Sequence, residues 1–425
     1  TAFPFSGSFG YFGVKLKKLN INIMIKNNII NIVRALFFPS LFIILFNSCT
    51  DVLNQAPDGK FSIEEVFQDD EKTAAYLNTC YGYIPGEGHA YYYWMRGPVD
   101  WCDEAWDTDA EAEPSLSSGL LYRGSVSAAS HFVHNLTVEA NNGNYWARMW
   151  EAIRKCTVFL NNIDDAKVKS EANRSRWKAE AHTLRAYYYM VLLKHFGCAL
   201  PIERTAYNYT DDFSETKRSS YYEVTQFIIE DCNAALSSPE LPWRITTGAE
   251  AYRFTKAVAE AIRSRMSLYA ASPLYNEGEN YWEEAYQVNK QALSNLKDNG
   301  YKLYDKAYFS TWNNNSDVHL PNDAAKLFNE YFCNSMSYDT NPTDKETIYQ
   351  TNVGQDWIGT EGVGAVKGYK SGSCPSQEIV DCFETIDGQP ILNLSKPYVD
   401  EITHLQPNYN PQNTLYNSQK PYENR

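Results

Sequence analysis

The stretch between residues 145 and 299 constrains the fold most, because apolar side chains recur there at three- and four-residue steps in one segment after another. This spacing places the apolar side chains on one face of a helix. It predicts five helices: Tyr145–Ile163, Arg176–Phe196, one from Ser220, Thr255–Ala271, and one from about Tyr281. Ser220 followed by Glu223 is typical of a capping box, and Gly197 stands where a helix C-cap is expected.

An internal repeat links two of these predicted helices. The series Ala179, Glu180, Ala181, Arg185, Tyr189 returns 80 residues later as Ala259, Glu260, Ala261, Arg265, Tyr269. Paired helices with small residues at close-approach positions are typical of tetratricopeptide repeats. The sequence therefore predicts a mainly α fold with a tetratricopeptide-like helix-pair scaffold over residues 145–299. Large apolar residues on the predicted helix faces, among them Trp146, Tyr187, Trp282, Tyr286 and Leu293, are expected in the core.

The composition changes outside this scaffold. Residues 83–144 and 305–376 contain stretches rich in Gly, Ser, Asn, Asp and aromatic residues, and these predict long irregular loops with a few short strands or helical turns. Long loops on a rigid scaffold commonly carry binding residues. The formal charge of −14 repels phosphate backbones, so nucleic acid is not an expected partner.

The N-terminal part carries an uncharged apolar run from Ala35 to Cys49, preceded by Lys26 and Arg34. The run is too short for a spanning helix and fits the apolar region of a signal peptide. Phe46-Asn47-Ser48-Cys49 resembles the lipobox of bacterial lipoproteins. We therefore expect residues 1–48 to be upstream residues and a lipoprotein signal peptide, and Cys49 to be lipidated. A cleaved signal followed by a chance cysteine is the alternative.

Motifs that would indicate an enzyme are absent from the sequence. It contains no Gly-x-Ser-x-Gly, no Walker A loop and no His-Glu-x-x-His. An acidic run begins at Asp103 and Glu104, and a solvated loop is its favoured interpretation. These carboxylates also lie beside Trp101 and Trp106, where they could hydrogen-bond sugar hydroxyls. A hydrolase could also use such carboxylates in pairs, so a glycoside hydrolase is a further interpretation that rests only on this acidic run. No catalytic residue, metal site or cofactor is predicted.

Four pieces of sequence, in order, carry a family resemblance. They are Cys49 followed by Asp51–Pro57, the Tyr145–Asp164 segment, Glu180–Tyr188 with Phe196-Gly197 and Pro201-Ile202, and Pro375–Asp381 with Phe383-Glu384 and Asp387-Gly388. Together they resemble the SusD/RagB family of outer-membrane glycan-binding lipoproteins. The resemblance implies a SusD-like domain over residues 49–425. The family continues beyond the point where this sequence ends, so a C-terminal truncation of the family fold is expected.

The resemblance also implies a function. A family member would be lipid-anchored in the outer membrane and exposed at the cell surface, bind oligosaccharides or other nutrients, and deliver them to a SusC-like TonB-dependent transporter. Such a protein is not an enzyme. The alternative is a helix-repeat scaffold for protein interactions on the cell envelope, because helix-pair repeats commonly bind peptides or proteins.

Tryptophans in the loop regions are the best candidates for the ligand site, because an aromatic ring packs against the C–H face of a sugar. Each needs a polar neighbour for the sugar hydroxyls. The predicted ligand-binding residues are Trp101, Asp103, Trp106, Trp312, Asn314 and Trp357. Arg185, in contrast, is expected to be a structural ion-pair or carbonyl partner, with a ligand role as the alternative.

Overall fold

The structure is a computed structural model of the chain. It describes residues 61–85, 101–107, 117–125, 127, 145–197, 200–208, 210–306, 323–333, 344–350, 373–393, 395–396, 408–417, 419–420 and 422–424. The chain divides into two compact units, residues 1–66 and 67–425. The features below belong to the second unit, except for the first turn of helix α3 (Ile63–Phe67), which lies in the first.

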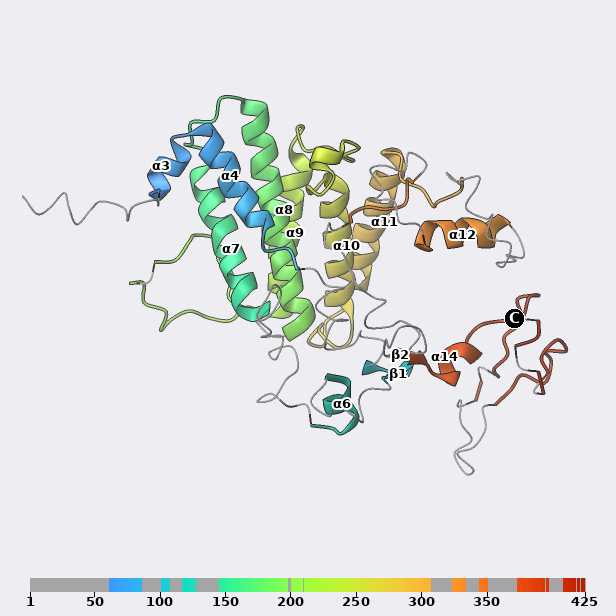
Figure 1. The fold of residues 1–425 in the computed structure, drawn as a ribbon. Coiled ribbons are helices and arrows are strands. Elements are labelled where there is room, and N and C mark those ends of the chain that lie inside the picture. The colour runs from blue at the N-terminus through green and yellow to red at the C-terminus, as the bar shows by residue number, and fades with distance from the viewer. Residues whose placement is uncertain are drawn as a thin grey trace, which may run out of the picture. The chain divides into compact units, whose positions relative to one another are not determined.

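A row of five helices forms the scaffold of the second unit (Figure 1). They are α7 (Tyr145–Asn162), α8 (Glu171–Phe196), α9 (Tyr221–Ser237), α10 (Lys256–Ala271) and α11 (Trp282–Asp298). Each helix packs on the next one along the chain, and α8 also contacts α10. The predicted fold class, a mainly α tetratricopeptide-like scaffold, is confirmed.

Helix α4 (Asp70–Tyr81), which was not predicted from the sequence, packs on α7 and α8. Leu77 and Cys80 are its fully buried apolar side chains. The Phe67, Tyr76 and Phe159 rings lie within 5.7–6.3 Å of one another, centroid to centroid, and fill the space beside α7. Helix α4 therefore closes the apolar face at the α7 end of the row.

The predicted helix ends are confirmed in detail. The Ser220 hydroxyl accepts the Glu223 N–H and the Glu223 carboxylate accepts the Ser220 N–H, which completes the capping box of α9. Gly197 ends α8 in the left-handed conformation, with φ of 53°. The largest difference is at the start of α8, which begins at Glu171, five residues before the predicted Arg176, because the Ser170 side chain caps it by accepting the Asn173 N–H.

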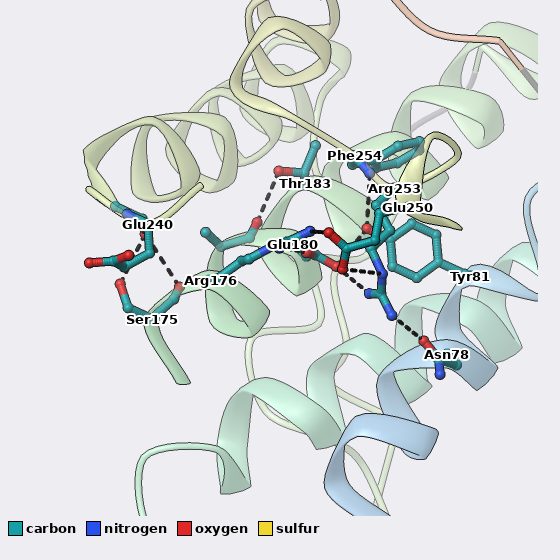
Figure 2. A network of polar contacts seen from close by, with 12 residues as sticks. Asn78, Tyr81, Ser175, Arg176, Glu180, Thr183, Glu240, Glu250, Arg253 and Phe254 are labelled. Atoms are coloured by element: carbon teal, nitrogen blue, oxygen red, sulfur yellow. Dashed lines mark hydrogen bonds and ion pairs between the residues drawn. The ribbon is translucent and has the colours of Figure 1, made fainter. Parts of the chain in front are cut away.

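A polar network joins α4, α8 and the segment before α10 (Figure 2). At its centre is the fully buried carboxylate of Glu180. This carboxylate accepts hydrogen bonds from Arg176 Nε at 2.9 Å, Arg253 Nη1 at 2.7 Å and the Tyr81 hydroxyl at 2.9 Å. The Tyr81 oxygen in turn accepts the Phe254 N–H at 3.0 Å. The buried Glu180 carboxylate and its two cationic partners therefore hold α4, α8 and the segment before α10 together.

The repeat places a second buried carboxylate at the equivalent position of α10. Glu260 is fully buried and accepts Arg263 Nε at 2.6 Å and Asn295 Nδ2 at 2.6 Å, which ties α10 to α11. The two arginines of the repeat differ in burial, because Arg185 is buried and Arg265 is exposed. Arg185 Nε and Nη2 donate to the two oxygens of buried Asp231, each at 2.8 Å, so its predicted structural role is confirmed.

Several large side chains expected in the core are exposed instead. Trp146 is 39% exposed, and on α11 Trp282, Tyr286 and Leu293 are 47%, 56% and 54% exposed. Within the part of the chain that the structure describes, α11 packs mainly on α10, and Ala285 and Ala292 are its buried residues. The prediction was wrong for Trp282, Tyr286 and Leu293, although Ala285 is buried as predicted, because α11 is the last helix of the row and part of its apolar face stays open.

The predicted loop regions contain short elements. Among the described residues of 83–144 these are strand β1 (Ala105–Asp107) and helix α6 (Ser117–Tyr122). In residues 305–376 they are the longer helix α12 (Asp323–Cys333) and strand β2 (Ser373–Pro375), which precedes helix α14 (Gln377–Asp381). A short 3-10 helix, η2 (Gly248–Glu250), precedes α10. None of the helices among the described residues has the length and apolarity to cross a membrane.

Candidate functional site

Strands β1 and β2 pair antiparallel and join two segments about 270 residues apart in the sequence. Trp106 lies opposite Cys374 in this pair, and Ala105 lies opposite Pro375. Ser376 extends the contact: its N–H donates to the Glu104 carbonyl at 2.8 Å, and its hydroxyl donates to the Asp103 carbonyl. The predicted binding loop therefore lies against the start of the Pro375–Asp381 segment, which is one of the four pieces that carry the family resemblance.

An aromatic platform stands on this strand pair. The Trp106 ring stacks on the Tyr122 ring of α6, with centroids 4.2 Å apart and an interplanar angle of 6°. The Tyr122 hydroxyl accepts the Asp107 N–H at 3.1 Å, which fixes the tyrosine beside the strand. Trp106 nevertheless remains 48% exposed. A flat indole that is supported on one face and open to solvent can stack on a partly apolar ring.

The predicted site residues near this platform fall into two groups. Trp106 and Asp103 are exposed, as a ligand-binding role requires, whereas Trp101 is half-buried. Glu104 adds a second exposed carboxylate, while Asp107 is buried. Tyr122 is the residue that sequence reasoning missed, because its local pattern gives no sign of the long-range stack with Trp106. Trp312, Asn314, Trp357 and Cys49 lie outside the described residues.

Two cavities flank α10. The α8/α10 cavity has a volume of about 590 Å³ and is lined by Pro85, Tyr187, Met190, Phe254, Val258, Ala261, Ile262, Arg265, Tyr331 and residues 346–349. The α10/α11 cavity has a volume of about 720 Å³ and a mostly apolar lining that includes Leu268, Tyr286, Leu293 and Leu296. Ala261, Arg265 and Ile348 line both. Tyr187 was predicted to be core, and the cavity shows that its helix face is only partly covered.

Metal-ligating groups do not gather at either place. In the described ranges no group of three or more His, Cys, Asp or Glu side chains is arranged to hold a metal ion. The side chains at the platform and in the cavities offer aromatic stacking and hydrogen bonding by Arg, carboxylate and tyrosine groups.

Residues 102–268 match the model of a SusD-like family that is described as starch-binding and associating with the outer membrane. This part of the chain is similar to the SusD-like family. The match covers β1, α6 and most of the scaffold, so the sequence resemblance to the SusD/RagB family is confirmed. The family description names binding rather than catalysis, which agrees with the prediction that the protein is not an enzyme.

Solved structures share the fold. A SusD-like protein from Bacteroides fragilis is 22% identical with a TM-score of 0.56, over 79% of this chain and 57% of that one. A SusD-like carbohydrate-binding protein from the same organism is 17% identical with a TM-score of 0.50, over 79% and 57%. The surface glycan-binding protein A from Bacteroides fluxus is 17% identical with a TM-score of 0.50, over 75% and 62%.

The SusD-like chain thus spans about three-fifths of the length of these structures. At such identities the likeness shows the fold. A comparison with curated proteins finds no match.

Proposed function

We propose that this SusD-like protein is a cell-surface lipoprotein that binds oligosaccharides or other nutrients and delivers them to a SusC-like TonB-dependent transporter. The observation that carries the proposal is the Trp106–Tyr122 platform, a supported and solvent-exposed aromatic surface beside the exposed carboxylates of Asp103 and Glu104. Sugar rings need both features: a flat ring for their C–H face and polar groups for their hydroxyls.

The family supports the same ligand class. Its description names starch binding and the outer membrane, and two of the similar structures are described as carbohydrate- or glycan-binding proteins. Lipidation at Cys49 would supply the membrane attachment, because several acyl chains on one residue give durable anchoring where one chain does not. Transfer to a transporter then requires no catalytic group, only a site that releases its ligand.

The test of the proposal is the affinity of the Trp106→Ala variant for an oligosaccharide, measured by isothermal titration calorimetry. A stacking ring contributes about 0.5–1.5 kcal/mol beyond area burial, so the affinity should fall about two- to tenfold. Trp282→Ala is the matched control, because Trp282 is as exposed as Trp106 (47% against 48%) but lies on α11 and lines neither cavity. Unchanged affinity in a folded Trp106→Ala variant would contradict the role of the platform.

A second candidate function has one observation in its favour. The open α10/α11 cavity exposes Leu268, Tyr286 and Leu293, which suits a helix-repeat scaffold for protein interactions on the cell envelope. This alternative predicts that no oligosaccharide in a panel binds, and that substituting Trp106 changes nothing. Binding of any oligosaccharide that Trp106→Ala weakens would decide against it.

A further inference from the structure

The α8/α10 cavity has a rigid aromatic wall. The Phe254 ring at its centre contacts the Tyr187 ring at 5.5 Å and the Tyr349 ring at 5.0 Å, both edge to face. The Phe254 N–H is held by the Tyr81 hydroxyl, which belongs to the buried Glu180 network of Figure 2. The wall is therefore fixed by hydrogen bonds and not only by packing.

The opposite side of the cavity is fixed as well. Residues 346–349 belong to a segment anchored by Arg244, which donates from Nη2 to the Asp344 carbonyl at 2.6 Å and from Nη1 to the Thr347 carbonyl at 3.0 Å. The Tyr304 N–H donates to Glu346 Oε2 at 2.8 Å and orients that carboxylate. Tyr331 of α12 shares a hydrogen bond with the Thr347 hydroxyl at 3.0 Å. Polar groups on this side thus have set positions before any ligand arrives.

Arg265 is the exception among the charged groups around the cavity. It is exposed, and no described residue hydrogen-bonds or ion-pairs with it. Its repeat equivalent, Arg185, is fully committed to buried Asp231 by two hydrogen bonds. Among the described residues, Arg265 of α10 has no equivalent of Asp231 as a partner. It lines the cavity instead. An arginine in this setting has five donors available for a ligand.

We propose that the α8/α10 cavity is a second glycan-binding site that takes one neutral pyranose unit, with Arg265 donating to its hydroxyls and Glu346 accepting from them. The partly exposed rings of Tyr187 and Tyr349, which pack on the buried Phe254 ring, supply the apolar surface that a sugar ring needs. One cation and one carboxylate on the same lining favour an uncharged ligand with vicinal hydroxyls over an anion or a cation. The volume of about 590 Å³ lies within the usual range for small-molecule sites, roughly 300–1,000 Å³.

This inference rests on the proposed function for its ligand class, but it concerns different residues. The Trp106–Tyr122 platform and the α8/α10 cavity share no side chain. The two assignments can therefore fail separately, and substitutions in one leave the other intact.

The test is calorimetric titration of the full chain with four probes: maltoheptaose, laminarihexaose, cellohexaose and xylohexaose. Arg265→Ala should weaken binding of at least one probe about tenfold, as expected for loss of a hydrogen bond from a charged donor. Glu346→Gln should also weaken it, by less, because the amide keeps an acceptor. Arg218→Ala is the matched control, since Arg218 is an exposed arginine that lines neither cavity. Equal melting temperatures establish that the variants fold.

The outcomes separate the two sites. If Trp106→Ala weakens a probe and Arg265→Ala does not, the cavity proposal is overturned and the proposed function stands. If Arg265→Ala and Glu346→Gln weaken a probe and Arg218→Ala does not, the cavity proposal is supported, whatever Trp106→Ala does. If none of the four probes binds the wild-type chain, both proposals are overturned.

Discussion

At the scale of single residues, the most consequential group is Asp231, a carboxylate only 3% exposed between Arg185 and His182. Replacing it with Asn leaves the Arg185 guanidinium buried without a counter-charge. Removing one partner of a buried ion pair costs about 3–5 kcal/mol, so Asp231→Asn should lower the free energy of unfolding by that amount, as urea denaturation would measure.

Asp164→Asn is the control for this prediction. Asp164, in the turn after α7, pairs with Lys178 of α8 at 2.7 Å, but the two side chains are 64% and 39% exposed. An exposed pair of this kind contributes about 0–1 kcal/mol, so the substitution should have little effect. If both variants lose the same free energy of unfolding, the buried Asp231–Arg185 pair does not stabilise the fold more than an exposed pair does.

Asp231 also makes stability depend on pH. Burial raises the pKa of its carboxyl, but hydrogen bonds from Arg185 and His182 outweigh burial and lower the pKa below the ordinary value of 3.8. The folded state therefore holds this proton less tightly than the unfolded state. The resulting stability is present above pH 3.8 and is lost as the pH falls through the lower folded-state pKa. In a melting-temperature series in acid, this loss should be present in the wild type and absent from Asp231→Asn.

At the scale of elements, helix α9 depends on its capping box. Ser220→Ala removes the acceptor of the Glu223 N–H, whose distance to the hydroxyl is 3.1 Å. Loss of such a cap costs about 0.5–2 kcal/mol of unfolding free energy. Ser219→Ala is the control next to it, because only the backbone N–H of Ser219 is engaged, with the Leu200 carbonyl. If both variants unfold at the same urea concentration, the cap does not stabilise the helix.

The element scale also shows what local sequence can predict. Capping residues such as Ser220 and Gly197 act within one turn, so their signals are complete in the sequence. Burial is different, because it depends on which neighbours a helix has. The apolar residues of α11 follow the helical period, yet Tyr286 and Leu293 are exposed, since the packed side of α11 is formed by alanines.

At the scale of the whole molecule, the candidate sites were only partly predictable. Trp106 and Asp103 were identified because they are aromatic and polar residues in a loop region. Tyr122 and Arg265 were not, since a stack between β1 and α6 and an arginine that lacks its repeat partner become visible only in three dimensions. Trp312, Asn314 and Trp357 remain predictions.

The central claim is that the protein captures glycans while anchored at the cell surface. The most direct measurement compares cells that produce the wild type with cells that produce Cys49→Ala, using a fluorescently labelled oligosaccharide that the purified wild type binds. The variant should leave the membrane fraction, keep its affinity in solution, and abolish labelling of intact cells, because loss of several acyl chains removes durable membrane attachment.

Two results would contradict this claim. Surface labelling that persists in Cys49→Ala cells, with the variant still in the membrane fraction at high salt, would contradict lipid anchoring at this residue. A wild type that stays on the membrane while intact cells bind none of the labelled oligosaccharide would contradict glycan capture at the surface.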